Sequence, residues 1–547
     1  MTPAAIAAFV LVVATVAAAA GVAITTRTGA AALGPPSFVD DTPSAGIAHT
    51  YDGGFEHAVG GGVAVFDCSD DGKPDVYIAG GSGPAALYRN ESEVAGALRF
   101  TRLPDPATDL AGVNGAYPLD IDGDGIVDLA VIRNGGNVLL RGLGGCRFAR
   151  GNELWTFDGG AATTNAFSAT WEPGATLPTL AFGNYLDPAS NDPHRLCFDN
   201  ELVRPAPASR GYGAPSPLTP SWCALSMLFS DWSRTGRMDL RVSNDAHYYL
   251  PTDGEEQLWR MDPSMAPALY TAADGWVRVQ IQGMGIASYD LTGDGYPEVY
   301  LTSQADNRLQ TLAVDATKPT YRDIGQKRGV NAAQPFTGGD IRPSTAWHAE
   351  FEDVNNDGIA DLFVAKGNVT ADADYAMKDP SDLFIGSADG TFREAADVAG
   401  ILNFDRARGG ALADFNLDGM LDLVQVSYGA PVRIWRNVGT GDAARPKAMG
   451  NWLAVDVRQP GPNANAIGAW VEVRTGDQTI RREQTVGGGH AGGQLGWTHF
   501  GIGDRGDADV RVIWPGGESG PWQHVRANEF VIVRRGAEVA RWSPAGR

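Results

Sequence analysis

The chain has 547 residues, of which 43% are hydrophobic and 70 are glycine, and its formal net charge is −22. This length is more than one typical domain needs, and so many glycines suit a fold with many tight turns. The negative charge argues against nucleic acid as a partner, because phosphate binding requires basic patches.

The first element is an apolar run over residues 4–24 that contains no charged side chain. It is about long enough to span a bilayer. Alanine-rich candidate cleavage sites lie around Ala17 to Ala20, but no basic residue precedes the run. We therefore expect either a cleaved signal peptide or a retained single-span membrane anchor. Both would place the rest of the chain outside the cytoplasm, as a secreted, periplasmic or membrane-anchored protein.

Six short runs further along the chain share one pattern, an oxygen-bearing side chain at positions 1, 3, 5 and 9 around a glycine at position 6. The residues at these positions are Asp67, Ser69, Asp71 and Asp75; Asp120, Asp122, Asp124 and Asp128; Asp231, Ser233, Thr235 and Asp239; Asp290, Thr292, Asp294 and Glu298; Asp353, Asn355, Asp357 and Asp361; and Asp414, Asn416, Asp418 and Asp422. A hard cation requires such oxygen ligands, so the pattern predicts about five or six bound Ca²⁺ ions. Solvated acidic turns are the alternative, but scattered surface acids would not repeat the same offsets.

The EF-hand shares the first six positions but also requires a glutamate at position 12 between two helices. Position 12 is never a carboxylate here, since it holds Ile78, Val131, Val242, Leu301, Val364 and Gln425. The flanking residues are short runs rich in β-formers, such as 62–66 and 422–426. Each run is therefore predicted to join two strands of a hairpin.

The runs recur roughly every 60 residues, with one gap about twice as long. The segment Trp171–Thr179 lies in that gap and fits the pattern, but it has lost most of its side-chain oxygens. We interpret it as a repeat without a metal loop, which makes seven repeats. A third apolar strand and a fourth strand that begins with an aromatic residue follow each hairpin, as at Phe100 and Phe392. Four strands per repeat predict a seven-bladed β-propeller whose third blade lacks a metal loop.

The seventh repeat shows no fourth strand after Asn437. The stretch Ser37–Ile47 resembles the fourth strand and exit turn of the sixth repeat, Thr391–Ile401. We expect this N-terminal stretch to supply the outer strand of the seventh blade and to close the ring.

The four cysteines fit an oxidising compartment, although isolated buried thiols are the alternative. Cys197 and Cys223 bracket a proline-rich insertion, 204–220, which we place between the third and fourth blades. Cys68 and Cys146 lie in turns that face the same side of a propeller, so a second bridge is compatible with the fold. A zinc site is not expected, because no CxxC or paired-histidine spacing occurs.

Several features carry a family resemblance. The repeats resemble the FG-GAP/VCBS repeats of integrin α-subunit propellers. The region 451–533 resembles the ASPIC/UnbV domain of the cartilage acidic protein-like family, through the segments Asn465–Arg474, Gly487–Leu495, His499–Gly503 and Val510–Gly516. The resemblance implies an exported calcium-binding propeller followed by a small C-terminal β-sandwich-like domain. His490 departs from it, since such domains more usually carry an aromatic residue there.

These observations divide the chain into an export or anchor segment with a spacer, 1–36, a propeller, 37–448, and a C-terminal β domain, 449–547. The segment Gly487–Gly492 matches a dinucleotide-binding pattern, but without a following helix it favours a glycine-rich hairpin. Arg505–Asp507 matches an adhesion tripeptide that chance also produces.

Two classes of function fit the sequence. The first is an extracytoplasmic recognition, adhesion or scaffold module, which binds an unidentified protein or glycan while calcium stiffens the propeller. The second is a calcium-dependent enzyme that acts on polysaccharide, a lyase or hydrolase, with acid-base groups among His247, His348 and Glu350. Packing is the alternative role for these three residues.

Overall fold

A computed structural model of the chain describes residues 32–187, 189, 196–207, 210–246, 253–313, 317–331, 342–370 and 374–544. The predicted export segment 4–24 and His247 lie outside these residues. The structure is built of strands, with short helical turns at η1 (Phe55–His57), η3 (Ala272–Asp274), α2 (Gly325–Arg328) and α3 (Ala396–Ala399). In the described part of the chain, no helix is both long and apolar enough to cross a membrane. The predicted all-β fold is confirmed.

Seven sheets, each containing a four-stranded antiparallel blade, are formed by the described strands between residues 37 and 439. We number the blades in chain order and give the strands of each from the innermost outward. Blade one contains β2 (Val63–Phe66), β3 (Asp75–Ile78), β5 (Ala86–Asn90) and β6 (Phe100–Arg102); blade two contains β7 (Ala111–Leu119), β8 (Asp128–Arg133), β9 (Val138–Gly142) and β10 (Phe148–Arg150); blade three contains β11 (Thr164–Thr170), β12 (Thr179–Asn184), β13 (Asn200–Val203) and β14 (Ser216–Leu218); blade four contains β15 (Ala224–Ser230), β16 (Asp239–Asn244), β17 (Gln257–Arg260) and β18 (Ala268–Leu269); blade five contains β19 (Gly283–Tyr289), β20 (Glu298–Ser303), β21 (Arg308–Leu312) and β22 (Tyr321–Asp323); blade six contains β23 (Ala346–Glu352), β24 (Asp361–Lys366), β25 (Asp382–Gly386) and β26 (Phe392–Glu394); and blade seven contains β27 (Arg406–Ala413), β28 (Asp422–Tyr428), β29 (Arg433–Gly439) and β1 (Ser37–Asp40). A short strand, β4 (Gly81–Pro84), adds to the inner edge of the second sheet.

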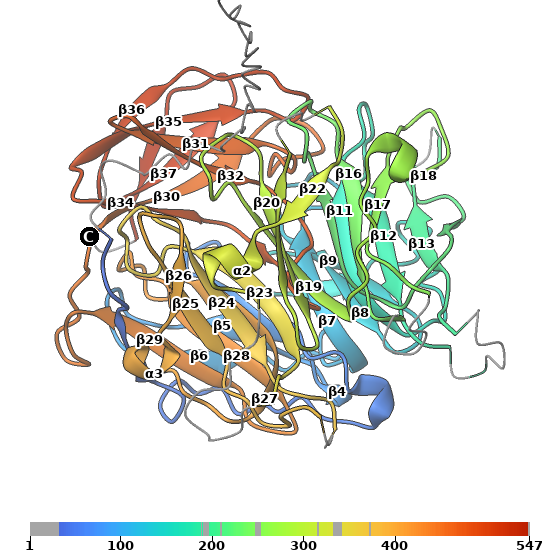
Figure 1. The fold of residues 1–547 in the computed structure, drawn as a ribbon, viewed down its shortest axis with the longest axis horizontal. Coiled ribbons are helices and arrows are strands. Elements are labelled where there is room, and N and C mark those ends of the chain that lie inside the picture. The colour runs from blue at the N-terminus through green and yellow to red at the C-terminus, as the bar shows by residue number, and fades with distance from the viewer. Residues whose placement is uncertain are drawn as a thin grey trace, which may run out of the picture.

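The innermost strands pack against one another in chain order, from β2 through β7, β11, β15, β19 and β23 to β27, and β27 packs back against β2. The sheets therefore form a closed ring around a central channel, which is the arrangement of a β-propeller (Figure 1). Each predicted loop joins the first and second strands of its blade, so we name the loops by blade: loop 1 (67–75), loop 2 (120–128), loop 4 (231–239), loop 5 (290–298), loop 6 (353–361) and loop 7 (414–422).

Ring closure follows the predicted route. Strand β1 pairs antiparallel with β29, with Phe38 opposite Asn437 and Asp40 opposite Trp435. Phe38 is buried in a core shared by blades six and seven. The N-terminal strand therefore covers the outer edge of β29, which would otherwise remain unpaired.

One prediction about the third blade is wrong. The proline-rich segment 204–220 is not an insertion between blades, because Ser216–Leu218 forms the outer strand β14 and pairs with β13. Pro217 lies opposite Glu201 in this pairing. An edge strand tolerates proline, since its outward positions need no amide hydrogen for the ladder, and the composition therefore concealed the strand.

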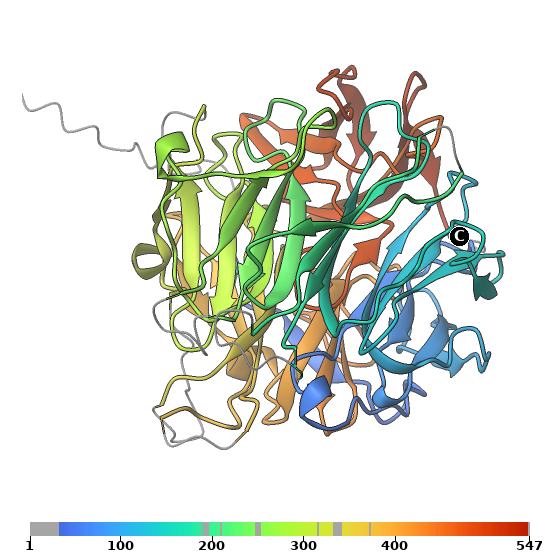
Figure 2. The ribbon, with the colours of Figure 1, turned by 90° about the vertical axis from the view of Figure 1, so that its right-hand side faces the viewer.

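The C-terminal strands form two further four-stranded sheets. One contains β34 (Thr498–Gly503), β30 (Asn451–Arg458), β37 (Glu529–Arg534) and β38 (Ala540–Trp542); the other contains β32 (Gln478–Glu483), β31 (Trp470–Thr475), β35 (Asp507–Ile513) and β36 (Gln523–Arg526). Val455 and Val531 of the first sheet share a buried core with Val471 and Val510 of the second. The two sheets therefore pack face to face as a sandwich, which lies on one side of the ring in both views (Figures 1 and 2).

Residues 486–495, which we call the channel segment, leave this sandwich and enter the propeller. Their terminal strand, β33 (Gln494–Leu495), pairs parallel with β2. Other residues of the segment form isolated bridges to the innermost strands of four more blades: Val486 to Ala169, Gly487 to Leu228, Gly489 to Ile286, and Gly492 to Ala116. One segment of the C-terminal domain thus hydrogen-bonds to five of the seven blades.

Steric constraints explain why the channel segment is rich in glycine. Gly487, Gly488 and Gly489 all have positive φ angles, of 123°, 74° and 53°. A Cβ at Gly492 would lie 2.2 Å from the carbonyl oxygen of Val63. The glycine run therefore permits the backbone to approach the inner strands closely. It does not form the hairpin that we expected, and no helix of the kind that a dinucleotide site requires follows it.

Candidate metal centres and the channel mouth

The first residue of each loop shapes its turn. In all six loops the position-1 aspartate accepts the backbone N–H of the position-6 glycine at 2.6 to 3.1 Å. The glycines at position 6 have φ angles between 79° and 95°, which disfavour side chains with a Cβ. This local geometry explains why aspartate and glycine recur at a fixed offset.

The position-9 carboxylate fastens each loop to its blade. In loop 2, Asp128 accepts the N–H of Ile121 at 2.8 Å and that of Gly142, in the third strand, at 2.7 Å. In loop 7, Asp422 makes the equivalent bonds with Phe415 and Asn437. These carboxylates are buried, and burial raises the pKa of Asp128 to about 8. A buried carboxylate is costly unless a cation or hydrogen bonds compensate it.

Two observations test whether the loops suit a cation. In loop 2, carboxylate oxygens of Asp120, Asp122 and Asp124 lie within 4.8 Å of one another. Asp122 Oδ1 and, in loop 7, Asn416 Oδ1 are buried acceptors without a hydrogen-bond partner. Both are position-3 atoms. Convergent oxygens with unused lone pairs are what a hard divalent cation coordinates, so these residues fit Ca²⁺.

Loop 4 differs from the others. Its position-9 carboxylate, Asp239, accepts both Nε and Nη2 of Arg237, at 3.2 and 3.1 Å, together with the side chains of Trp232 and Tyr270, each at 2.8 Å. Its Ser233 and Thr235 hydroxyls contact each other at 3.0 Å. An arginine therefore already supplies the positive charge in this loop.

The predicted metal-free repeat forms the turn between β11 and β12. Its one carboxylate, Glu172, pairs with Arg204 at 2.8 Å. This turn thus offers no group of acidic oxygens of the kind that loop 2 provides.

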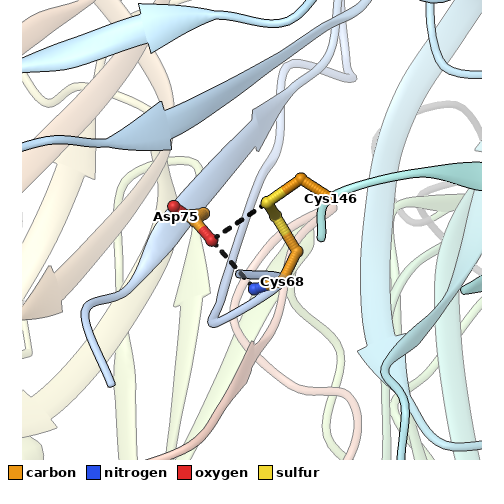
Figure 3. Close-up of side chains that lie close together, drawn as sticks. All are labelled: Cys68, Asp75 and Cys146. Atoms are coloured by element: carbon orange, nitrogen blue, oxygen red, sulfur yellow. Dashed lines mark hydrogen bonds between the residues drawn. A yellow bond between two sulfur atoms is a disulfide. The ribbon is translucent and has the colours of Figure 1, made fainter. Parts of the chain in front are cut away.

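Both cysteine pairs form disulfides, Cys68 with Cys146 and Cys197 with Cys223. The first pair links loop 1 to the outer turn of the second blade, and Asp75 Oδ2 lies 3.5 Å from Cys146 Sγ (Figure 3). Because both sulfurs are oxidised, no thiolate is present beside Asp75 to bind a metal. The disulfides instead tie neighbouring blades together and fit an oxidising, extracellular location.

A cavity of about 540 Å³ lies at the channel mouth, between the propeller and the C-terminal sandwich. The predicted acid-base residues His348 and Glu350 line it and lie 3.5 Å apart. His348 Nδ1 accepts the N–H of His490 at 3.2 Å, while Glu350 accepts the N–H of Leu412 and the side-chain amide of Gln494. These two residues therefore hold the channel segment, and both ring nitrogens of His348 are engaged.

Two arginines near the channel segment had no sequence signal. Arg482 pairs with Glu352 through both of its terminal nitrogens and so joins β32 to the sixth blade. Arg408 is fully buried, donates to the carbonyl oxygens of Ala58 and Gly367, and stacks 4.2 Å from the Trp347 ring. Burial lowers the pKa of Arg408 to about 9. Their partners come from distant parts of the chain, so no local pattern marks them.

His490 leads to a pH prediction. Burial, with Arg408 and His348 nearby, lowers the pKa of His490 to about 3, and its Nε2 contacts the Val59 carbonyl oxygen at 2.8 Å. A histidine that is neutral when folded stabilises the protein above its unfolded pKa of about 6.5, and this contribution is lost as pH falls toward 3. Between pH 6.5 and 5 we expect His490 alone to account for a loss of about 2 kcal/mol in the free energy of unfolding, beside that of His499, whose pKa burial also lowers to about 3. Thermal melts of wild type and His490→Gln should diverge in their pH dependence below pH 6.5, and parallel curves would contradict this role.

Comparison with known proteins agrees with these features. A family model of the FG-GAP-like repeat matches residues 67–131 and 353–425, and a model named ASPIC and UnbV matches residues 459–540. The chain carries FG-GAP-like repeats and an ASPIC/UnbV domain. The two resemblances predicted from the sequence are thereby confirmed.

Curated relatives match only part of the chain. Human cartilage acidic protein 1 is 26% identical over 174 residues, which cover 30% of this chain and 23% of that protein. The Xenopus tropicalis protein of the same name is 26% identical over 179 residues, covering 30% and 24%. The match thus spans about a quarter of these relatives.

Two solved structures also show similarity. One is an Agrocybe aegerita lectin described by its recognition of non-reducing terminal N-acetylglucosamine, with a TM-score of 0.39, 15% identity, and coverage of 68% of this chain and 93% of that one. The other is BBS1N in complex with ARL6DN, with a TM-score of 0.42, 9% identity, and coverage of 76% and 100%.

Proposed function

We propose that this protein is an exported, calcium-binding recognition, adhesion or scaffold module that binds a protein or glycan outside the cytoplasm. The observation that carries the proposal is the pair of buried position-3 oxygens without a hydrogen-bond partner, Asp122 Oδ1 and Asn416 Oδ1. Calcium would coordinate these oxygens and stiffen each hairpin. The FG-GAP-like repeats, the ASPIC/UnbV domain and the two disulfides support the extracellular placement.

The loops are not equivalent as calcium sites. We expect ions in loops 1, 2, 6 and 7. In loop 2 Arg141 contacts Asp122 Oδ2 and Asp124 Oδ2, which leaves Asp122 Oδ1 without a hydrogen-bond partner. Loop 5 is a weaker candidate, because Arg481 pairs with Asp290 at 3.0 Å. We leave out loop 4, where Arg237 occupies the position-9 carboxylate.

The geometry favours a binding module over the alternative of a calcium-dependent polysaccharide lyase or hydrolase. The candidate acid-base pair, His348 and Glu350, is occupied with holding the channel segment. A general base needs a free lone pair within reach of its substrate. The channel segment also crosses this face of the propeller and lines the cavity together with His348 and Glu350.

Calcium stoichiometry and a binding screen test the proposal together. Equilibrium dialysis followed by metal analysis should give four to five ions per chain, and Asp122→Ala with Asp124→Ala should remove one of them.

An array of glycans and secreted proteins, probed with and without calcium, should give a partner whose binding requires the ion. Absence of bound calcium at millimolar concentration would refute the metal assignment, and turnover of a polysaccharide would favour the enzyme.

A further inference from the structure

The C-terminal domain lies directly on loop 1. The indole Nε1 of Trp497 donates to the carbonyl oxygen of Gly72 at 3.0 Å. A Cβ at Gly72 would lie 2.2 Å from the Trp542 ring, so this ring rests on the loop backbone. Trp497 and Trp542 also pack on each other, with ring centroids 5.2 Å apart. A pair of tryptophans thus covers a candidate calcium loop.

Loop 7 is covered by the same aromatic cluster. A Cβ at Gly419 would lie 1.8 Å from Nε1 of Trp452, and Leu417 shares a buried cluster with Trp452 and Phe530. In the same loop Asn416 is 0% exposed, its amide donates to the carbonyl oxygen of Gly96 in the first blade, and its Oδ1 has no hydrogen-bond partner. The unused acceptor is therefore buried in a loop whose neighbouring residues contact the C-terminal domain.

Loop 6 is the most deeply enclosed. The carbonyl oxygen of Gly358 accepts the side-chain amide of Gln478 at 3.1 Å, and that of Asn356 accepts the N–H of Gly503 at 2.9 Å. Asp353 and Asp361 are 6% and 1% exposed. No lysine or arginine in the described chain forms an ion pair with either of them. Backbone N–H groups donate to both carboxylates, but no basic side chain among the described residues neutralises them, so a bound cation would offset their negative charge.

From these contacts we propose that the C-terminal domain closes over the cation sites of loops 1, 6 and 7, so that calcium binding and domain docking are energetically linked. This inference rests on the calcium binding proposed above. An occupied loop holds the backbone conformation that receives the tryptophans. An empty loop leaves like charges facing one another, which distorts that surface. Linkage is reciprocal, so docking must raise calcium affinity by the factor by which calcium favours docking.

The same arrangement limits how an ion reaches or leaves loop 6. A small pocket of about 170 Å³ between the domains is lined by Asp357 and Gly358 of loop 6 and by Asp477 and Asp504 of the sandwich. Asp477 and Asp504 are exposed, so they present negative charge at the solvent side of this path. Residues 33 and 34 cover loop 6 as well, through Asp357 and Asn355, so the loop is enclosed by two segments and we expect release of its ion to be slow.

Reciprocal measurements test the linkage. In a Trp452→Ala, Trp542→Ala variant we expect calcium affinity at these loops to fall by about 5- to 150-fold and the slow phase of release to a chelator to accelerate. Trp522→Ala is the matched control, because Trp522 belongs to the same domain but stacks between Arg474 and Arg511, away from the loops. Unchanged affinity and release in the double variant would overturn the proposal.

Hydrogen exchange on the wild-type protein tests the linkage in the other direction, from calcium to docking. It does not depend on whether a variant folds. The N–H groups of Gly488 and Gly489 donate to Met227 and Ile286 of the propeller at 2.7 and 2.6 Å, so their protection reports docking. Chelation should increase their exchange at least tenfold while amides of β12, in the blade without a metal loop, remain protected. Equal protection in a protein shown to bind calcium would refute the linkage alone, whereas a protein that binds no calcium would refute the proposed function instead.

Discussion

Removal of calcium by excess chelator is expected to lower the melting temperature by about 10 degrees or more. A ligand that binds only the folded state stabilises it by about 2.7 kcal/mol when its concentration is 100 times Kd. For a chain of 547 residues, an unfolding entropy of about 2.1 cal/mol/K per residue converts four such sites into a shift of roughly 10 degrees. Scanning calorimetry with and without calcium measures this directly.

Matched variants separate calcium from other effects of the chelator. Asp414→Asn removes the position-1 carboxylate of loop 7 but keeps its size, and it should lower the melting temperature only when calcium is present. Asp231→Asn in loop 4 is the counterpart, because Arg237 already neutralises that loop. Its response to calcium should equal that of wild type. Identical melting curves for the wild-type protein in calcium and in chelator would show that the loops do not depend on the ion.

Deletion of residues 37–48 is expected to cause aggregation, because it removes β1 and exposes the edge of β29. The deletion also removes Asp41, which accepts Arg436 Nε at 2.8 Å, and the buried residues Ala45 and Ile47. Light scattering and gel filtration after expression measure the outcome. A monomeric product with a native melting curve would show that the ring does not need its N-terminal strand.

The control truncation must end before residue 33. The N–H of Leu33 donates to Asp357 Oδ2 at 2.7 Å, and the carbonyl oxygen of Gly34 accepts the side-chain amide of Asn355 at 3.2 Å. A chain without residues 1–32 keeps these contacts and should stay soluble and folded. A chain without residues 1–36 should remain folded but lose affinity at loop 6.

The sequence by itself determined the features that depend on local backbone geometry. Aspartate at position 1 and glycine at position 6 close the turn through one hydrogen bond, so six copies of the pattern revealed six hairpins and their period. The similarity of Ser37–Ile47 to the end of the sixth repeat identified the closing strand, because a fourth strand carries the same alternation wherever it enters the chain. The repeat spacing likewise placed Cys68 and Cys146 on one side of the ring, where they form a disulfide.

Only the tertiary structure decided what each local pattern contacts. Loop 4 matches the metal pattern, yet Arg237 pairs with Asp239, its position-9 carboxylate. The glycine run at 487–489 pairs with no strand near it in the sequence. It crosses the channel because it forms bridges to strands more than 190 residues away in the chain. His348 and Glu350 converge as expected but bind that segment. Local sequence specifies turns and strands through short-range sterics and hydrogen bonds, whereas charge compensation and burial depend on neighbours that only the folded chain brings together.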